Sequence, residues 1–167
     1  GSNVLVGDGG VRGLVLRMRH GTITPVGANG VRADGGVTIN GLVRWTIQRG
    51  LGGLERWTGT PGTVGGAVHG NAHFDGRLLG DMVTSVGLVN RAGTVSCVPR
   101  AEMGFGYDDS RVQHTGELVL WAEFRVAPGQ VNELRTAARR SLAFRKCTQP
   151  LDRVSAGCVF QNPRLED

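Results

Sequence analysis

A glycine-rich segment in the first half of the chain has the composition of a ligand-binding loop. It combines a proline turn with three glycines and two hydroxyl side chains, in the order Thr60, Pro61, Gly62, Thr63, Val64, Gly65, Gly66 and Ala67. Successive glycines leave backbone N–H groups free to point at a phosphate or a planar ring. The spacing fits neither a Rossmann loop nor a Walker loop. The residues alone leave two interpretations open, a ligand-binding loop and a turn that only lets two strands pack closely.

Two side chains near the other end of the chain could also do chemistry. Arg145 would place a fixed cation beside a diphosphate or a reduced ring, although an arginine at the end of a helix also pairs with the helix dipole. Cys158 carries a thiol, which is a far stronger acid than a hydroxyl and is still protonated near pH 7. The alternative for Cys158 is a small buried side chain, and this is the interpretation that we keep for Cys97 and Cys147.

Charge, composition and cysteine spacing exclude several classes of protein. The net charge is +5, and the basic residues are spread along the chain rather than gathered into a nucleic-acid-binding block. The three cysteines are far apart and lack CxxC spacing, which argues against a disulfide framework and against a metal site. No apolar run approaches the roughly 20 residues of a membrane span. The mild positive charge suits an anionic small ligand such as a nucleotide, and equally an ordinary basic surface.

The hydrophobic pattern predicts a single α+β unit that would position these residues. Extended segments are expected at 4–6, 14–18, 26–33 and 35–39, a hairpin at 83–90 and 94–98, and a strand buried on both faces at 117–126. Asn40 is expected to cap a helix that ends at Arg49, before Gly50. A second helix is expected over 131–145, with a buried stripe of Val131, Leu134, Ala138 and Leu142. Glycine, at 28 residues, exceeds twice the roughly 7% of average usage and predicts many tight turns.

Motifs at three places resemble those of the UDP-N-acetylenolpyruvoylglucosamine reductase family. The segment GLGGLERWTGTPGTVGGAV, residues 50–68, resembles the signature of that family. The opening residues 1–6, GSNVLV, resemble the end of its GGGSN-type loop. Near the other end, RKCTQPL at 145–151 and SAGCVFQNP at 155–163 resemble its R-x-x-T-Q-P-L and S-A-G-S-V-F-x-N-P motifs. The motifs occur in the family's order, and the resemblance covers essentially the whole chain.

The resemblance implies both a fold and a reaction. The fold is an FAD-binding domain of the vanillyl-alcohol-oxidase (PCMH) type, an α+β domain with a mixed or antiparallel sheet and flanking helices, over 1–146. Residues 147–167 would begin a C-terminal substrate-binding domain. In the reaction, NADPH reduces FAD, and a hydride from flavin N5 then reduces the enolpyruvyl ether of UDP-N-acetylglucosamine to UDP-N-acetylmuramate for peptidoglycan synthesis. The resemblance thus implies a UDP-sugar substrate, a cytoplasmic location and, we expect, a monomer.

The same resemblance assigns roles to particular residues. Cys158 occupies the position of the family's proton donor, which is usually a serine. Asn71 lies in a motif near the flavin ring, and Arg145 matches an arginine at the FAD site. The remaining residues expected at the cofactor come from the opening loop and the glycine-rich loop, and they are Gly1, Ser2, Asn3, Pro61, Gly62, Thr63, Val64, Gly65, Gly66 and Ala67.

The chain departs from the family pattern at Asp108. The family has a tyrosine–arginine pair before a serine, and its arginine stabilises the developing enolate and the substrate carboxylate. Here Tyr107 is followed by Asp108, whose carboxylate would repel an anionic substrate. We hypothesise that Arg111 takes the role of the missing arginine. Three polar residues also replace small or apolar ones, and for each of them both ligand contact and local hydrogen bonding remain open: His69, His73 and Asp75.

The two ends of the chain predict a fragment. It opens on Gly1-Ser2-Asn3 directly before an apolar run, and it closes at Asp167 without a stop feature. We therefore expect that both termini of the family are missing, and that the isolated chain retains FAD weakly or not at all and has no reductase activity. Two other functions stay open, a related flavoprotein oxidoreductase with another substrate and a non-catalytic nucleotide-binding remnant.

Overall fold

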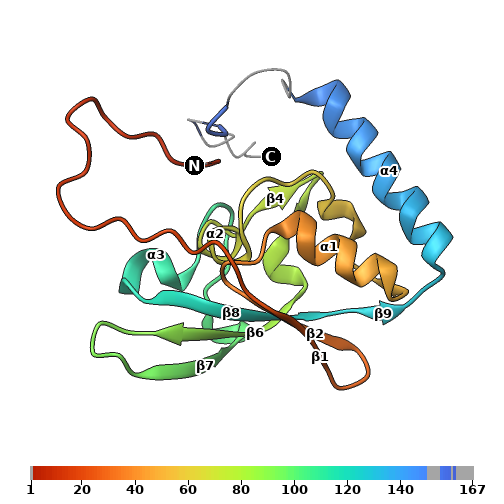
Figure 1. Ribbon diagram of the computed structural model, residues 1–167, viewed down its shortest axis with the longest axis horizontal. Helices are drawn as coiled ribbons and strands as arrows, with labels where there is room; N and C mark the ends of the chain where they lie inside the picture. Colours follow the sequence, from red (N-terminus) through yellow and green to blue (C-terminus); the bar gives the residue numbers. More distant parts are fainter. Residues whose placement is uncertain (1, 150–154, 159, 161–167) are drawn as a thin grey trace, which may run out of the picture.

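The computed structural model describes residues 2–149, 155–158 and 160. Its centre is a five-stranded antiparallel sheet in the order β1-β2-β8-β6-β7. In that order the strands are Ile23–Val26, Gly30–Asp34, Leu118–Arg125, Val83–Val89 and Val95–Pro99. Figure 1 shows α1 (Ile39–Gln48) and α2 (Val64–His69) over one face of this sheet. The α+β class predicted from the sequence is therefore confirmed.

One hydrophobic core joins the sheet to the helices. Alternate residues of the central strands point into it, and Val31, Val86, Leu88 and Phe124 are fully buried. The helices close the core with Leu42, Val43, Ile47, Val64 and Val68. Burial of each such side chain contributes about 1.5–3 kcal/mol. The core therefore fixes where α2 lies, and with it the glycine-rich loop that leads into α2.

The first helix begins two residues earlier than the sequence predicted. Thr38, not Asn40, is the N-cap, because the Thr38 side chain accepts a 3.0 Å hydrogen bond from the N–H of Gly41. Asn40 instead accepts from the N–H of Gly59 at 2.7 Å and donates to the carbonyl of Thr60 at 3.2 Å. The prediction that Gly50 follows the helix end is confirmed, with φ +66° at that glycine. Asn40 thus holds the segment before the glycine-rich loop against α1.

The hairpin of β6 and β7 and the strand β8 are confirmed, but β8 is not buried on both faces. Val119, Ala122 and Phe124 are buried, whereas Trp121 and Glu123 on the other face are only partly buried. A register shift lies between Gly87 and Leu88 of the neighbouring strand. Such a bulge changes which residues face the core, and it explains why the sequence of β8 alternates poorly.

The long helix α4 (Val131–Thr148) extends three residues beyond the predicted end at 145. Leu134, Ala138 and Arg145 are its buried residues, whereas Val131 and Leu142 are only partly buried. The helix packs beside the 3-10 turn Glu55–Trp57, where the hydroxyl of Ser141 donates to the carbonyl of Arg56 at 2.6 Å. Figure 1 shows that α4 lies further from the sheet than α1 and α2. Its last turn carries Arg145 towards the glycine-rich loop.

Short elements connect these parts. The two-residue strands pair as β3 with β9 and β4 with β5, and a five-residue helix α3 precedes β8. These elements are Leu51–Gly52, Ala127–Pro128, His73–Phe74, Arg77–Leu78 and Arg111–Thr115, with further 3-10 turns at Leu79–Asp81 and Arg100–Glu102. Among the helices that the structure describes, none is both long enough and apolar enough to cross a bilayer.

Three predicted extended segments are wrong as strands. Residues 4–6 and 14–18 lie in irregular, exposed chain, because a strand needs a neighbour to accept its backbone hydrogen bonds and no described residue pairs with them. Residues 35–39 form a turn into α1, in which the N–H of Gly35 donates to Leu120 at 2.6 Å. The segment 26–33 is divided by a turn at Gly27, with φ +58°.

Candidate functional site

The glycine-rich loop is a turn followed by the first turn of α2. Thr63 caps the helix, since its hydroxyl accepts from the N–H of Gly66 at 3.3 Å. The loop is tied to the segment before α1 by hydrogen bonds from Ile39 N–H to the Gly62 carbonyl and from Val64 N–H to the Val37 carbonyl, at 3.1 and 2.8 Å. Gly62 has φ +93°, a conformation that favours glycine. The loop is therefore rigid and held by the core elements.

Most of its N–H groups are already used inside the protein. Val64 donates to Val37, Gly65 donates to the Gly35 carbonyl at 2.9 Å, and Gly66 and Ala67 both donate to Thr63. Within the part of the chain that the structure describes, the N–H groups of Gly62 and Thr63 have no protein acceptor. The prediction that the glycine pair presents free donors is wrong, and the free donors lie at the start of the loop.

Arg145 is the unusual charge of the site. Its side chain is buried, at 3% exposure, and it donates to the Thr60 hydroxyl at 2.6 Å while its guanidinium carbon lies 3.5 Å from the centre of the Phe74 ring. Its Nε is buried without a hydrogen-bond partner, and no carboxylate among the described residues forms an ion pair with it. Loss of solvent lowers the pKa of the guanidinium. A buried cation without a counter-charge is costly, and an anionic ligand would offset that cost.

Three segments that are distant in the sequence meet beside this loop. The Ser2 hydroxyl lies 2.9 Å from the point that a Cβ on Gly62 would occupy, and the Asn3 side-chain oxygen lies 2.7 Å from the corresponding point on Gly157. Cys158 follows Gly157 and is exposed. Figure 1 shows this stretch beside the N-terminal end of the chain, above α2. The opening residues thus lie against both the glycine-rich loop and the residue before Cys158, whereas Gly1 lies outside the described residues.

Asn71 has a positioning role in the structure. It is fully buried with φ +41°, and its amide donates to the Gly106 carbonyl at 2.6 Å while its oxygen accepts from Gly80 N–H at 2.8 Å. Both polar ends of the side chain are therefore used to hold the loop at residue 106 against the segment that follows α2. A direct contact of Asn71 with a cofactor stays a prediction.

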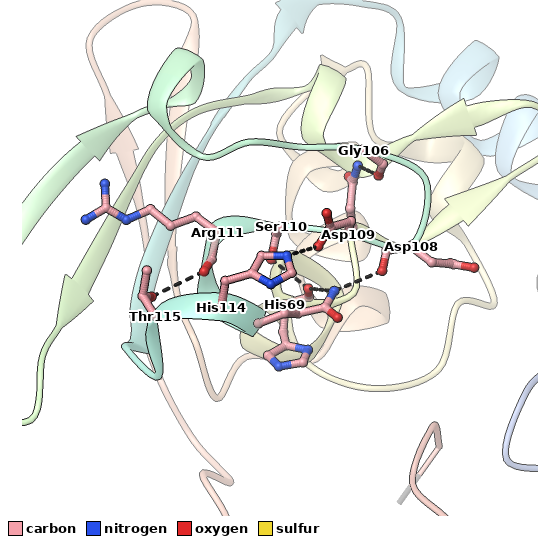
Figure 2. Close-up of polar contacts among 10 residues, drawn as sticks. His69, Gly106, Asp108, Asp109, Ser110, Arg111, His114 and Thr115 are labelled. Carbon is pink, nitrogen blue, oxygen red and sulfur yellow. Dashed lines mark hydrogen bonds and ion pairs between the residues drawn. The ribbon is translucent and has the colours of Figure 1, made fainter.

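The segment that departs from the family pattern is a tight turn, shown in Figure 2. Gly106 and Asp109 exchange backbone hydrogen bonds of 3.1 and 3.4 Å, which puts Asp108 at the tip with φ +53°. The carbonyl of His69 accepts from Ser110 at 2.7 Å and from Gln113 at 2.8 Å. The turn is therefore fastened to the end of α2. The imidazole of His69 is exposed, so this residue contributes its backbone to the arrangement.

Arg111 is paired with Glu117. Its Nε and Nη2 lie 2.9 and 3.3 Å from the two carboxylate oxygens, and this interaction is the main cause of a lowered pKa for Glu117. Figure 2 shows the Arg111 side chain pointing away from His69 and Asp108. A catalytic role for Arg111 stays a prediction, and it would require that the ion pair with Glu117 break.

Sequence reasoning missed the partner of Asp108. The carboxylate lies 3.0 Å from Nδ1 of His73, and the Tyr107 hydroxyl lies 3.5 Å from Nε2 of the same ring. Asp75 instead forms an exposed 3.6 Å ion pair with Arg56. The unusual residue types at 73 and 108 were visible in the sequence, but no local spacing relates positions so far apart.

Comparison with known proteins identifies the family. A family model described as "FAD binding domain" matches residues 1–98 of the chain. The chain belongs to this family. The FAD-binding fold type inferred from the motifs is thereby confirmed.

Individual similar proteins give a more specific relationship than the family model does. UDP-N-acetylenolpyruvoylglucosamine reductase of Syntrophus aciditrophicus is 37% identical over 170 residues, which cover 98% of this chain and 54% of that protein. The enzyme of the same name from Lactobacillus acidophilus is 36% identical over 163 residues, covering 98% and 55%. The crystal structure of UDP-N-acetylenolpyruvylglucosamine reductase from Thermus caldophilus superposes with a TM-score of 0.72 at 31% identity, covering 79% of this chain and 48% of that one. The chain is a homologue of these reductases and spans about half their length.

Proposed function

We propose that the chain is the FAD-binding part of a reductase that converts UDP-N-acetylglucosamine enolpyruvate to UDP-N-acetylmuramate in peptidoglycan synthesis. The names of the similar proteins support this activity. The structural observation that supports the proposal is the contact of the opening residues with two other segments. Ser2 lies against Gly62 of the glycine-rich loop, and Asn3 lies against Gly157, the residue before Cys158. A proton donor must lie next to the cofactor that reduces the substrate.

The residues at the loop fit the diphosphate of FAD. The cation of Arg145 faces the Thr60 end of the loop, and within the described part of the chain no carboxylate pairs with it and its Nε has no hydrogen-bond partner. The free N–H groups of Gly62 and Thr63 and the Ser2 hydroxyl add donors beside it. Charge-assisted hydrogen bonds of this kind are the strong ones for an anion. Small residues at 65–67 would let the cofactor approach, and Gly1 would join Ser2 and Asn3 at the diphosphate.

Cys158 would supply the proton of the reaction. FAD, reduced by NADPH, supplies when bound a hydride to C3 of the enolpyruvyl group. The Cys158 thiol holds a proton at Sγ and gives it to C2, so the double bond becomes a single bond and the thiolate regains its proton from solvent. The exposure of Cys158 permits that return. Arg111 would join the reaction only after release from Glu117.

The remaining features of the proposal concern the whole protein. Residues 1–146 would form the FAD-binding domain and residues 147–167 would begin a substrate-binding domain, a boundary that lies inside the last turn of α4. The partner molecule is a UDP-sugar, and we place the protein in the cytoplasm as a monomer that uses NADPH.

The test uses the full-length protein, of which this chain would form the FAD-binding part. We expect a yellow protein that oxidises NADPH only when the enolpyruvyl sugar nucleotide is present. Cys158→Ser is expected to retain turnover, because a hydroxyl can still donate a proton, whereas Cys158→Ala is expected to lose about 10²–10⁴-fold in kcat. A colourless protein, or a Cys158→Ala variant with unchanged kcat, would contradict the proposal.

Asp108 favours a second candidate, a related flavoprotein oxidoreductase with a different substrate. An aspartate at the tip of the 106–109 turn adds negative charge to the surface near the site, and this charge would repel an anionic substrate. Under this candidate the protein binds FAD and oxidises NADPH, but the enolpyruvyl sugar nucleotide does not stimulate the reaction.

A further inference from the structure

The non-glycine residues with left-handed backbone gather in one place. Of the residues that the structure describes, Asn71, Asp75 and Asp108 have this conformation, with φ of +41°, +51° and +53°. All three belong to two loops that lie against each other, one after α2 and one before α3. Such backbone is costly and persists where the surroundings hold it, often at sites that present a side chain to a ligand.

The two loops form one unit. The buried amide of Asn71 joins them through the Gly106 carbonyl at 2.6 Å, and the His69 carbonyl accepts from Ser110 and Gln113. Gln113 also donates to the Asp108 carbonyl at 2.9 Å. These hydrogen bonds hold the backbone of the turn, and they therefore restrict where the Asp108 carboxylate can lie.

His73 meets that carboxylate. Its Nδ1 lies 3.0 Å from the Asp108 oxygen, which makes Nδ1–H a donor to the carboxylate and leaves Nε2 as the other edge of the ring. The Tyr107 ring lies 4.6 Å from the His73 ring, and its hydroxyl is 3.5 Å from Nε2. The His73 and Asp108 side chains are 33% and 35% exposed. A ligand can therefore reach both side chains, while the contact with Asp108 holds the His73 ring at its Nδ1 edge.

The strand β4 connects this pair to the candidate cofactor site. His73 is followed by Phe74, whose ring lies under the guanidinium of Arg145, and Arg145 bonds to Thr60 of the glycine-rich loop. Phe74 and His73 therefore form the two sides of one short strand, one towards Arg145 and the other towards Asp108. The short strand thus places His73 next to the candidate cofactor site.

We infer that His73, held by Asp108, is a substrate-binding residue that carries a proton on both ring nitrogens in the complex, so that its Nε2–H donates to an anionic oxygen of the substrate, beside the Tyr107 hydroxyl. The inference rests on the proposed function, because the sugar nucleotide carries both a carboxylate and a diphosphate. The bare Asp108 carboxylate would repel either group, whereas His73 covers it and presents a donor. Asp108 acts through His73 and is a positioning residue.

The experiment measures steady-state kinetics and flavin content of the full-length product of the reading frame. His73→Gln is expected to raise KM for the enolpyruvyl sugar nucleotide about 10- to 100-fold, the effect of losing one charge-assisted hydrogen bond. Flavin content and the rate of flavin reduction by NADPH are expected to stay within about twofold, since His73 does not hold the cofactor. His114→Gln is the matched control, because His114 forms a similar 2.7 Å pair with Asp109 on the exposed side of the same turn.

Two further measurements sharpen the result. The Asp108→Asn change is expected to raise KM less than His73→Gln, and the double variant is expected to be no worse than His73→Gln alone, because the two residues act as a unit. Inhibition by UDP-N-acetylglucosamine, which lacks the carboxylate, identifies the oxygen: unchanged inhibition in His73→Gln assigns the carboxylate, and weakened inhibition assigns the diphosphate.

The outcomes separate this inference from the proposed function. A wild-type protein without flavin, or without turnover of the sugar nucleotide, contradicts the proposed function itself. A wild-type protein that turns over the substrate while His73→Gln keeps its KM, loses flavin instead, or behaves like His114→Gln overturns only the role of His73.

Discussion

Replacing Arg145 with methionine should weaken FAD binding while the stability of the apoprotein stays unchanged or rises. Arg145 is buried, no carboxylate of the described residues pairs with it, and its Nε has no hydrogen-bond partner among them. If Arg145 binds the diphosphate of FAD, its buried charge destabilises the apoprotein, and the bound cofactor offsets this loss of stability. Methionine fills a similar volume and keeps the contact with the Phe74 ring. Arg145→Met should therefore weaken cofactor binding without weakening the apoprotein.

The magnitudes follow from the contacts. In the apoprotein the change removes the 2.6 Å hydrogen bond to Thr60, worth about 1 kcal/mol net, and it also removes the desolvation penalty of an unpaired cation, which is at least as large. The free energy of unfolding should thus stay within about 1 kcal/mol of wild type, or rise. The lost charge-assisted contacts to the cofactor should cost about 1.5–3 kcal/mol, which raises the Kd for FAD roughly 10- to 150-fold.

The assay compares urea unfolding of the apoprotein with titration of FAD, both on the full-length product of the reading frame. Lys146→Met is the control, because Lys146 is an exposed cation in the same last turn of α4. It tests whether any cation near the helix end would act alike through the dipole. A loss of about 3 kcal/mol or more in the apoprotein, with an FAD affinity equal to that of Lys146→Met, would refute the reasoning and make Arg145 a structural residue.

Three further predictions concern the supports of the site. Glu117→Gln should lower the free energy of unfolding at neutral pH by no more than about 1 kcal/mol, and the difference from wild type should vanish in acid. Arg111 lowers the pKa of the Glu117 carboxyl in the folded state, so the ion pair stabilises the protein above the ordinary carboxyl pKa and stops doing so as the pH falls through the lowered pKa. Urea midpoints of both proteins at several pH values would reveal this convergence. Gly62→Ala should destabilise by about 1–2 kcal/mol because of its φ of +93°, whereas Gly70→Ala, with φ −90°, should be nearly neutral in the same thermal melts. Asn71→Ala should cost about 2–4 kcal/mol in chemical unfolding by leaving the buried Gly80 N–H and the partly buried Gly106 carbonyl unsatisfied, and a smaller loss would show that the 106–109 turn does not depend on Asn71.

Local sequence patterns predicted the parts of the fold that depend on neighbours along the chain. The hairpin at 83–90 and 94–98, the helix before Gly50 and the helix from 131 were all visible, because turn residues and helical spacing act over a few positions. The strands expected at 4–6 and 14–18 failed for the opposite reason, since a strand forms only where another segment accepts its hydrogen bonds.

The candidate site divides in the same way. Residue types alone indicated Arg145, Cys158 and the glycine-rich loop as places for chemistry, and the motifs indicated a flavin. They did not reveal which N–H groups remain free, because Val64 to Ala67 donate to partners that include Val37 and Gly35, and only the folded chain brings these partners near.

By itself, the sequence determined the family, the class of cofactor and the residues with reactive or charged side chains. Only the tertiary structure decided their partners: Arg145 is buried against Thr60 with no counter-charge from the described residues, Arg111 is paired with Glu117, and His73 covers Asp108. The physical reason is that chemical type belongs to a residue, whereas burial and pairing belong to distances between residues 6 to 85 positions apart, and these distances are set by the packing of the sheet, α2 and α4.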